Sequence, residues 1–203
     1  MRLPAALSVA LVAFALVAGA CGQPVPPPVA VGEPSVDTGD LAVIRGLIDD
    51  HRRRVAPARP HFLVVDTTLA SCVNVPPPGA CLSDSAIEEV SRLLPRARVR
   101  TGTLDFESRN ARPVPITGSL GTDVSYVSWT LIDFSSRADL LRKLPAGSAV
   151  VAFSRPSYPA PRVAVLAYSA FQNVVDAARL VQQADGRWEV DVATLPVWQT
   201  GLD

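Results

Sequence analysis

The chain has 203 residues, and its 19 basic and 19 acidic side chains give a formal net charge of zero. A balanced charge provides no electrostatic attraction for nucleic acid, so we expect no nucleic-acid partner. The length suffices for one domain with a sizeable core.

Residues 1–21 have the pattern of a secretory signal. Arg2 provides a positive charge, a run of apolar residues follows, and three small residues precede Cys21. The apolar run falls short of the ~20 residues that span a bilayer comfortably, which disfavours an ordinary transmembrane anchor. We therefore expect residues 1–20 to be a signal peptide.

The end of this segment, Ala18-Gly19-Ala20-Cys21, resembles the lipobox of bacterial lipoproteins, although lipoproteins most often have leucine at the position of Ala18. The resemblance implies that signal peptidase II cleaves before Cys21, and that this cysteine carries a palmitate-containing lipid that attaches the protein to the membrane. Gly22 stands where an aspartate would resemble an inner-membrane retention signal. The expected location is the cell envelope, at the outer membrane facing the periplasm in a Gram-negative host.

A proline-rich segment follows the cysteine. Residues 22–38 read GQPVPPPVAVGEPSVDT and contain five prolines, a composition that favours an extended polyproline II conformation. At about 3.1 Å per residue, this segment could hold a domain up to ~50 Å from the lipid. We expect a tether over 21–38 and a single domain over 39–203. A proline-rich ligand for an aromatic groove is the alternative.

The first part of the domain predicts a helix and then a strand. Asp40 is positioned to N-cap a helix over about 41–54, and His51 is expected at the edge of the core. An apolar stripe at helical spacing supports this helix: Leu41, Ile44, Ile48 and Val55. A buried strand is expected over 61–66.

A second helix is expected over about 84–94. Ser85 and Glu88 have the spacing of a capping box, and Pro95 ends the helix. Residues 96–100 then alternate between arginine and apolar residues, which predicts a half-exposed strand. Two prolines, Pro113 and Pro115, break the pattern that follows.

From residue 124 the pattern is mainly that of strands. Alternation over 127–132 predicts one strand, and a short capped helix is expected over 136–144. Four further strands are predicted to form a meander: Ala149–Phe153, Val163–Phe171, Arg179–Gln183 and Trp188–Val192. Asp185-Gly186 is expected to make the last hairpin turn.

In the last strand, Trp188, Val190 and Val192 are expected to face the core, while the charged residues between them face water. The order of the elements indicates an α+β fold. It consists of a mostly antiparallel sheet ending in a meander, with two or three short helices, in a single domain.

Four segments are similar to a group of secreted bacterial proteins of unknown function. They are Phe106-x-x-Arg109-Asn110-x-x-Pro113, Phe153-Ser154-Arg155-Pro156, Arg162–Tyr168 and Asp185-Gly186-Arg187-Trp188-x-Val190. The resemblance covers roughly residues 85–192 and implies a strand, a turn, a strand and a hairpin. It implies no activity.

Once Cys21 is assigned to the lipid, Cys72 and Cys81 remain as a pair. In an exported protein, cysteines this close usually form a disulfide. A metal half-site is the alternative, but it needs two more ligands, and His51 and His61 are the only histidines. We expect the disulfide, with no metal and no cofactor.

Candidate catalytic groups are sparse. Residues 117–121, Thr-Gly-Ser-Leu-Gly, approach a nucleophile elbow but lack its first glycine and precede a strand. Asp66 follows a strand, and Asp105 and Glu107 would share one face of a strand, so carboxylate acid–base chemistry is one hypothesis. We favour solvated surface carboxylates instead, and predict no catalytic residue.

Arg109, Asn110 and Arg112, together with Arg155, are the candidate binding surface, because arginine and asparagine recognise polar groups well. We favour the alternative that these side chains tie loops to backbone carbonyl groups. The expected function is that of a lipid-anchored, non-catalytic binding or scaffolding module with an envelope protein as its partner. A small periplasmic hydrolase using carboxylates is the second hypothesis.

Overall fold

The computed structural model describes residues 35–74, 81–128, 142–170 and 175–194. These residues form three α-helices, two short 3₁₀ helices and seven β-strands. The helices are α1 (Thr38–Val55), η1 (Cys72–Asn74), α2 (Asp84–Leu93), η2 (Arg96–Arg98) and α3 (Val99–Arg109). The strands are β1 (Phe62–Val65), β2 (Val124–Val127), β3 (Ala149–Phe153), β4 (Ser157–Ala160), β5 (Val163–Ala170), β6 (Asp176–Gln182) and β7 (Trp188–Ala193).

The strands form one mixed sheet in the order β2-β1-β3-β5-β6-β7, and β4 pairs with β5 beside this path. The strands from β3 onward pair antiparallel, and β5, β6 and β7 form the expected meander. However, β1 pairs parallel with both β2 and β3. Parallel neighbours need a long crossover connection, and α2 and α3 lie in the connection from β1 to β2. The α+β class is confirmed in this coarse form.

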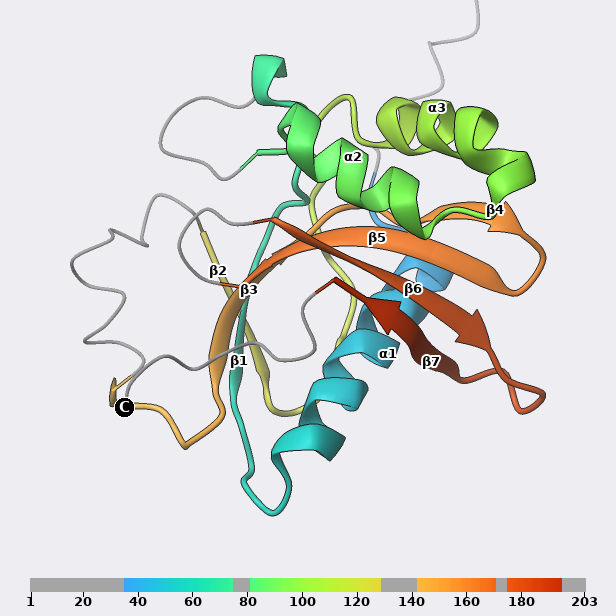
Figure 1. The fold of residues 1–203 in the computed structure, drawn as a ribbon. Helices are drawn as coiled ribbons and strands as arrows, with labels where there is room; N and C mark the ends of the chain where they lie inside the picture. The colour runs from blue at the N-terminus through green and yellow to red at the C-terminus, as the bar shows by residue number, and fades with distance from the viewer. Residues whose placement is uncertain (1–34, 75–80, 129–141, 171–174, 195–203) are drawn as a thin grey trace, which may run out of the picture. The chain divides into compact units, whose positions relative to one another are not determined.

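Helices cover both faces of the sheet, α1 on one face and α2 with α3 on the other (Figure 1). Alternate residues of β3 therefore enter two cores. Val151 packs with Ile44 of α1, whereas Val150 packs with Val90 of α2. Because β3 is covered on both sides, it is apolar and buried throughout.

The predicted helix over 41–54 is confirmed, but it begins earlier, at Thr38. Its N-cap is Asp37, whose carboxylate accepts the N–H of Asp40 at 2.8 Å, and not Asp40 itself. His51 is buried at the edge of the core, as expected. Within the described ranges, no helix is both long and apolar enough to cross a membrane.

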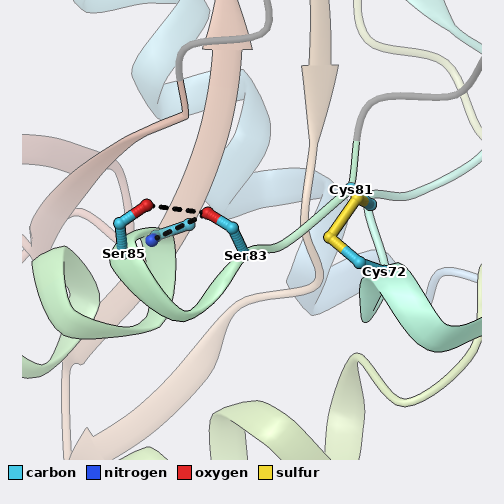
Figure 2. Close-up of a disulfide and its surroundings, with 5 residues drawn as sticks. Cys72, Cys81, Ser83 and Ser85 are labelled. Carbon is cyan, nitrogen blue, oxygen red and sulfur yellow. Dashed lines mark hydrogen bonds between the residues drawn. A yellow bond between two sulfur atoms is a disulfide. The ribbon is translucent and has the colours of Figure 1, made fainter.

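The second helix is also confirmed, with a corrected cap. The N-cap is Ser83, two residues before Ser85, and its hydroxyl accepts the N–H of Ala86 at 3.4 Å (Figure 2). Close to this cap, Cys72 and Cys81 form the predicted disulfide, with their Cα atoms 4.8 Å apart. The disulfide joins η1 to the strand-like segment that leads into α2.

The strand predicted over 96–100 is wrong, because these residues form η2 and the first turn of α3. Only Gly102 and Phe106 of α3 are buried. With one large apolar side chain in the core, the helix shows no apolar repeat in its sequence. Asp105 and Glu107 consequently lie on a helix, where residues two apart do not share a face.

The C-terminal hairpin has one register change that the sequence pattern does not reveal. Leu180 pairs with Val190 and Arg179 pairs with Val192, so Asp191 is an extra residue in β7. Trp188 and Val190 pack against the core as predicted, but the bulge turns Val192 outward into solvent. Gly186, with φ +86°, makes the predicted turn.

Several sequence predictions fall outside the described residues and stay predictions. At the N-terminus they are the signal peptide over 1–20, the lipid at Cys21 and most of the tether over 21–38. Further along, they are the part of the predicted strand beyond Ser128 and the short helix expected over 136–144, most of which lies in 129–141.

Candidate functional site

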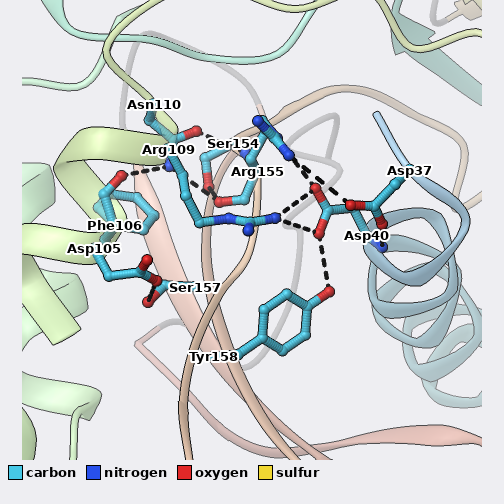
Figure 3. A network of polar contacts seen from close by, with 10 residues as sticks. All are labelled: Asp37, Asp40, Asp105, Phe106, Arg109, Asn110, Ser154, Arg155, Ser157 and Tyr158. Carbon is cyan, nitrogen blue, oxygen red and sulfur yellow. Dashed lines mark hydrogen bonds and ion pairs between the residues drawn. The ribbon is translucent and has the colours of Figure 1, made fainter. Parts of the chain in front are cut away.

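A buried carboxylate lies in the first turn of α1. The Asp40 side chain is 1% exposed, and it accepts hydrogen bonds from three side chains of other elements. Arg109, at the end of α3, donates through Nη2 at 2.7 and 2.9 Å. Arg155, after β3, donates through Nε at 3.1 Å, and the Tyr158 hydroxyl of β4 donates at 2.9 Å (Figure 3). We call these four residues the Asp40 cluster.

Burial and charge in the Asp40 cluster favour a neutral phenol at Tyr158. Two guanidinium groups surround one buried carboxylate, and Asp37 lies 3.9 Å from Arg155 as a second, more exposed anion. Burial, followed by the negative charge of Asp40, raises the pKa of Tyr158. The phenol of Tyr158 therefore stays protonated and donates to Asp40. The Arg109 guanidinium lies 5.4 Å from the centre of the Tyr158 ring, at the distance of a cation–π contact.

Asn110, the C-cap of α3, binds the turn that carries Arg155. Its Nδ2 donates to the carbonyl groups of Phe106 at 2.9 Å and Arg155 at 3.1 Å, and its Oδ1 accepts the N–H of Arg155 at 2.7 Å. The side chain is buried, and all three of these contacts are to the backbone. This geometry corresponds to the alternative role, in which asparagine ties loops to carbonyl groups.

The structure thus brings together three of the four residues of the predicted binding surface, Arg109, Asn110 and Arg155. Their polar groups point at Asp40 and at the backbone (Figure 3). Arg112 lies exposed beyond the end of α3 and takes no part in these contacts. Whether the four residues contact a partner stays a prediction.

Sequence reasoning missed the two other members of the cluster, Asp40 and Tyr158. The sequence predicts a helix cap at Asp40, yet Asp40 also lies four residues before Ile44 and eight before Ile48. That spacing places it on the apolar stripe, where an acidic residue is buried and needs cationic partners. No comparable signal pointed to Tyr158, because β4 itself was not predicted.

The remaining carboxylates and the 117–121 loop show structural contacts. Asp105 accepts the hydroxyl of Ser157 at 2.8 Å. In the loop, Ser119 O accepts Arg45 at 2.6 Å, and a Cβ at Gly118 would lie 2.0 Å from Leu41. This loop is packed against α1, and opens no helix.

The two histidines have different surroundings. His51 Nε2 lies 3.0 Å from Gly147 O, and burial lowers the pKa of His51 against the opposing effect of that hydrogen bond. His61 Nε2 lies 3.0 Å from Ser125 Oγ across β1 and β2, a pair that sequence reasoning did not anticipate. A hydrolytic serine also needs a group that orients the histidine. Asp123, two residues before Ser125 in the sequence, has its carboxylate bound by Arg52.

An open pocket of about 570 Å³ lies between α1 and the β6–β7 hairpin. Four arginines and two aspartates line it, with Trp188 between them: Arg45, Arg52, Arg53, Arg187, Asp49 and Asp185. Arg52 is bound by Asp49 and Asp123. The side chains of Arg53 and Arg187 are 51% and 68% exposed, and each is paired with an aspartate, Arg53 with Asp50 and Arg187 with Asp185. Arg45 instead donates to a carbonyl oxygen, and arginines outnumber aspartates in the lining four to two.

No group of three or more histidine, cysteine or acidic residues that could hold a metal ion occurs among the described residues. Comparison of the chain with protein-family models, with curated proteins and with solved structures finds no match.

Proposed function

We propose that the chain is a lipid-anchored, non-catalytic module of the bacterial cell envelope that holds a protein partner near the membrane. The signal-like residues 1–20, Cys21 and the proline-rich segment 22–38 support the anchor and its tether. The disulfide between Cys72 and Cys81 supports export to an oxidising compartment.

The observation that carries the proposal is the Asp40 cluster. It fastens the first turn of the domain, directly after the tether, to α3 and to β4. Val36 is buried there, and its N–H donates to Pro115 O at 3.1 Å. Terminal residues of a domain are usually poorly ordered unless they are tied down, so this attachment suits a domain displayed on a tether.

The same cluster argues against carboxylate catalysis at Asp40. Both oxygens of the carboxylate accept charged or phenolic donors, and the side chain is inaccessible to a substrate. Its role is therefore to hold α1, α3 and β4 together.

The pocket between α1 and the β6–β7 hairpin is the partner site in this proposal. The excess of arginines over aspartates in the lining would attract an acidic segment of the partner, and Trp188 offers an aromatic surface beside them. An acidic protein segment is therefore the proposed occupant.

Site-specific photo-crosslinking in intact cells tests this assignment. A photoreactive amino acid at position 187 should give one adduct of discrete mass, and Arg53→Glu should remove that adduct. The same amino acid in place of the exposed Arg59, outside the pocket, is the control and should give none. Equal adducts at positions 187 and 59, or an adduct unchanged by Arg53→Glu, would contradict the pocket as partner site.

The pair formed by His61 and Ser125 favours a second candidate, a serine hydrolase. A base within hydrogen-bonding distance of a hydroxyl is the minimum for an activated nucleophile. Within the described residues, however, no carboxylate binds the other ring nitrogen of His61, so the third member of a triad is missing there. The non-catalytic module remains the better supported function.

A further inference from the structure

Three arginines and a leucine are exposed where α2 leads into α3. We call this the α3 arginine surface, and it consists of Arg96, Arg98, Arg100 and Leu104. All four residues are exposed, with Leu104 at 57%. Arg100 and Leu104 lie one turn apart on the helix, so they share the face turned away from the buried Gly102 and Phe106.

The positive charge of this surface is not compensated locally. In the part of the chain that the structure describes, the side chains of Arg96, Arg98 and Arg100 enter no ion pair. The adjacent Arg92, by contrast, binds Glu88 at 2.7 Å. Glu107 lies seven residues beyond Arg100, about 10 Å along the helix axis. Three guanidinium groups are therefore free to bind external anions.

The place of this surface in the fold relates it to the proposed anchor. The far end of α3 carries Arg109, which binds Asp40 where the tether joins the domain. An 11-residue helix is about 16 Å long, whereas residues 21–34 in an extended conformation would reach about 40 Å. The α3 arginine surface could thus reach the membrane that holds the lipid.

We propose that the α3 arginine surface docks on the anionic phospholipid headgroups of this membrane. Arginine binds phosphate with paired hydrogen bonds, and the exposed Leu104 suits the boundary between headgroups and acyl chains. Each arginine near an anionic bilayer contributes about fivefold in affinity, and the tether raises the local concentration of the surface. The inference rests on the proposed function, because the lipid at Cys21 brings the domain to the membrane.

Docking would also orient the module. α3 covers the face of the sheet opposite to α1 (Figure 1). The pocket is lined from α1 and the hairpin, so docking through α3 leaves it turned towards the aqueous compartment. One domain would then meet the membrane on one side and its partner on the other.

Vesicle reconstitution of the full chain, purified from membranes, tests the proposal. One set of vesicles contains phosphatidylcholine alone and the other also contains phosphatidylglycerol. Flotation reports attachment, and amide hydrogen exchange over 96–104 reports docking. Arg98→Glu with Arg100→Glu is the test variant. Arg54→Glu with Arg59→Glu, which makes the same charge change on exposed residues elsewhere, is the matched control.

We expect the wild-type chain to float with both vesicles, and residues 96–104 to exchange several-fold more slowly on those with phosphatidylglycerol. High salt and the test variant should abolish this difference, and the control should retain it. Flotation with equal exchange on both vesicles would overturn the docking proposal and leave the anchor intact. If the chain does not float with phosphatidylcholine, the lipid anchor is refuted. In that case the docking proposal stands only if the wild type floats with vesicles that contain phosphatidylglycerol and the test variant does not.

Discussion

The carboxylate of Asp40, in the first turn of α1, accepts two contacts from the guanidinium group of Arg109, 69 residues further along the chain. This pair joins the helix on one face of the sheet to the end of a helix on the other. It connects the two layers at the point where the proposed tether meets the domain.

Replacing Asp40 with asparagine should destabilise the fold strongly. The variant leaves Arg109 and Arg155 partly buried around a neutral amide, and breaking a buried ion pair typically costs about 3–5 kcal/mol. Asp191→Asn, which breaks the more exposed pair with Arg179, is the control and should cost less than about 1 kcal/mol. Urea unfolding measures both free energies, and similar losses in the two variants would contradict a structural role for the cluster.

Protonation of His51 should weaken the fold in mild acid. Burial lowers the pKa of His51 in the folded protein, so the unfolded chain binds the proton more readily. The stabilisation that comes from a neutral His51 is then fully present above the ordinary histidine pKa of about 6.5. It is lost as the pH drops below that value. Urea midpoints measured from about pH 7 to pH 5 should fall less steeply in His51→Gln than in the wild type. An unchanged pH slope in that variant would show that His51 does not contribute.

Trp188 should be a stabilising residue of the β6–β7 hairpin, whereas its neighbour Glu189 should not. The indole packs against the core close to α1, where a Cβ on Gly46 would lie 2.7 Å from its carbonyl oxygen. Trp188→Ala should cost about 3 kcal/mol, at the lower end for buried tryptophans because the ring is only partly buried. Glu189→Ala is the matched control on the other side of the strand. Equal shifts in the thermal midpoint would refute the register of β7.

The domain should hydrolyse no ester, phosphate, peptide or glycoside above background. The wild type, Ser125→Ala and His61→Gln should therefore give the same rates with chromogenic substrates. Asp66→Asn and Asp105→Asn test the carboxylate hypothesis in the same assay. A turnover in the wild type that disappears in Ser125→Ala and His61→Gln, with folding intact, would establish the hydrolase instead.

Elements with a regular apolar period could be predicted from the sequence, and elements without one could not. The stripe from Leu41 to Ile48 predicted α1, and the apolar run at 149–153 predicted β3 with its observed bounds. α3 was missed because Phe106 is its only large buried side chain. β4 was missed because it is four residues long and contains Pro159, which cannot donate to a neighbouring strand.

The candidate site was predicted only in part, for a physical reason. Arg109, Asn110 and Arg155 stood out as polar residues near prolines, but the partners of their side chains are decided by tertiary packing. Asp40 lies in another helix, and Tyr158 in the strand that was missed. The bulge at Asp191 was hidden in the same way, since an inserted residue leaves the alternation of the sequence intact while it reverses the side chains that follow.

The most direct test of the proposed function is the mass of the N-terminal peptide of the protein taken from the membrane fraction. We expect this peptide to begin at Cys21 and the cysteine to carry diacylglycerol. Labelled palmitate should enter the wild type but not Cys21→Ala. A membrane-bound protein with an unmodified thiol at Cys21, or a label that persists in Cys21→Ala, would contradict the lipid anchor.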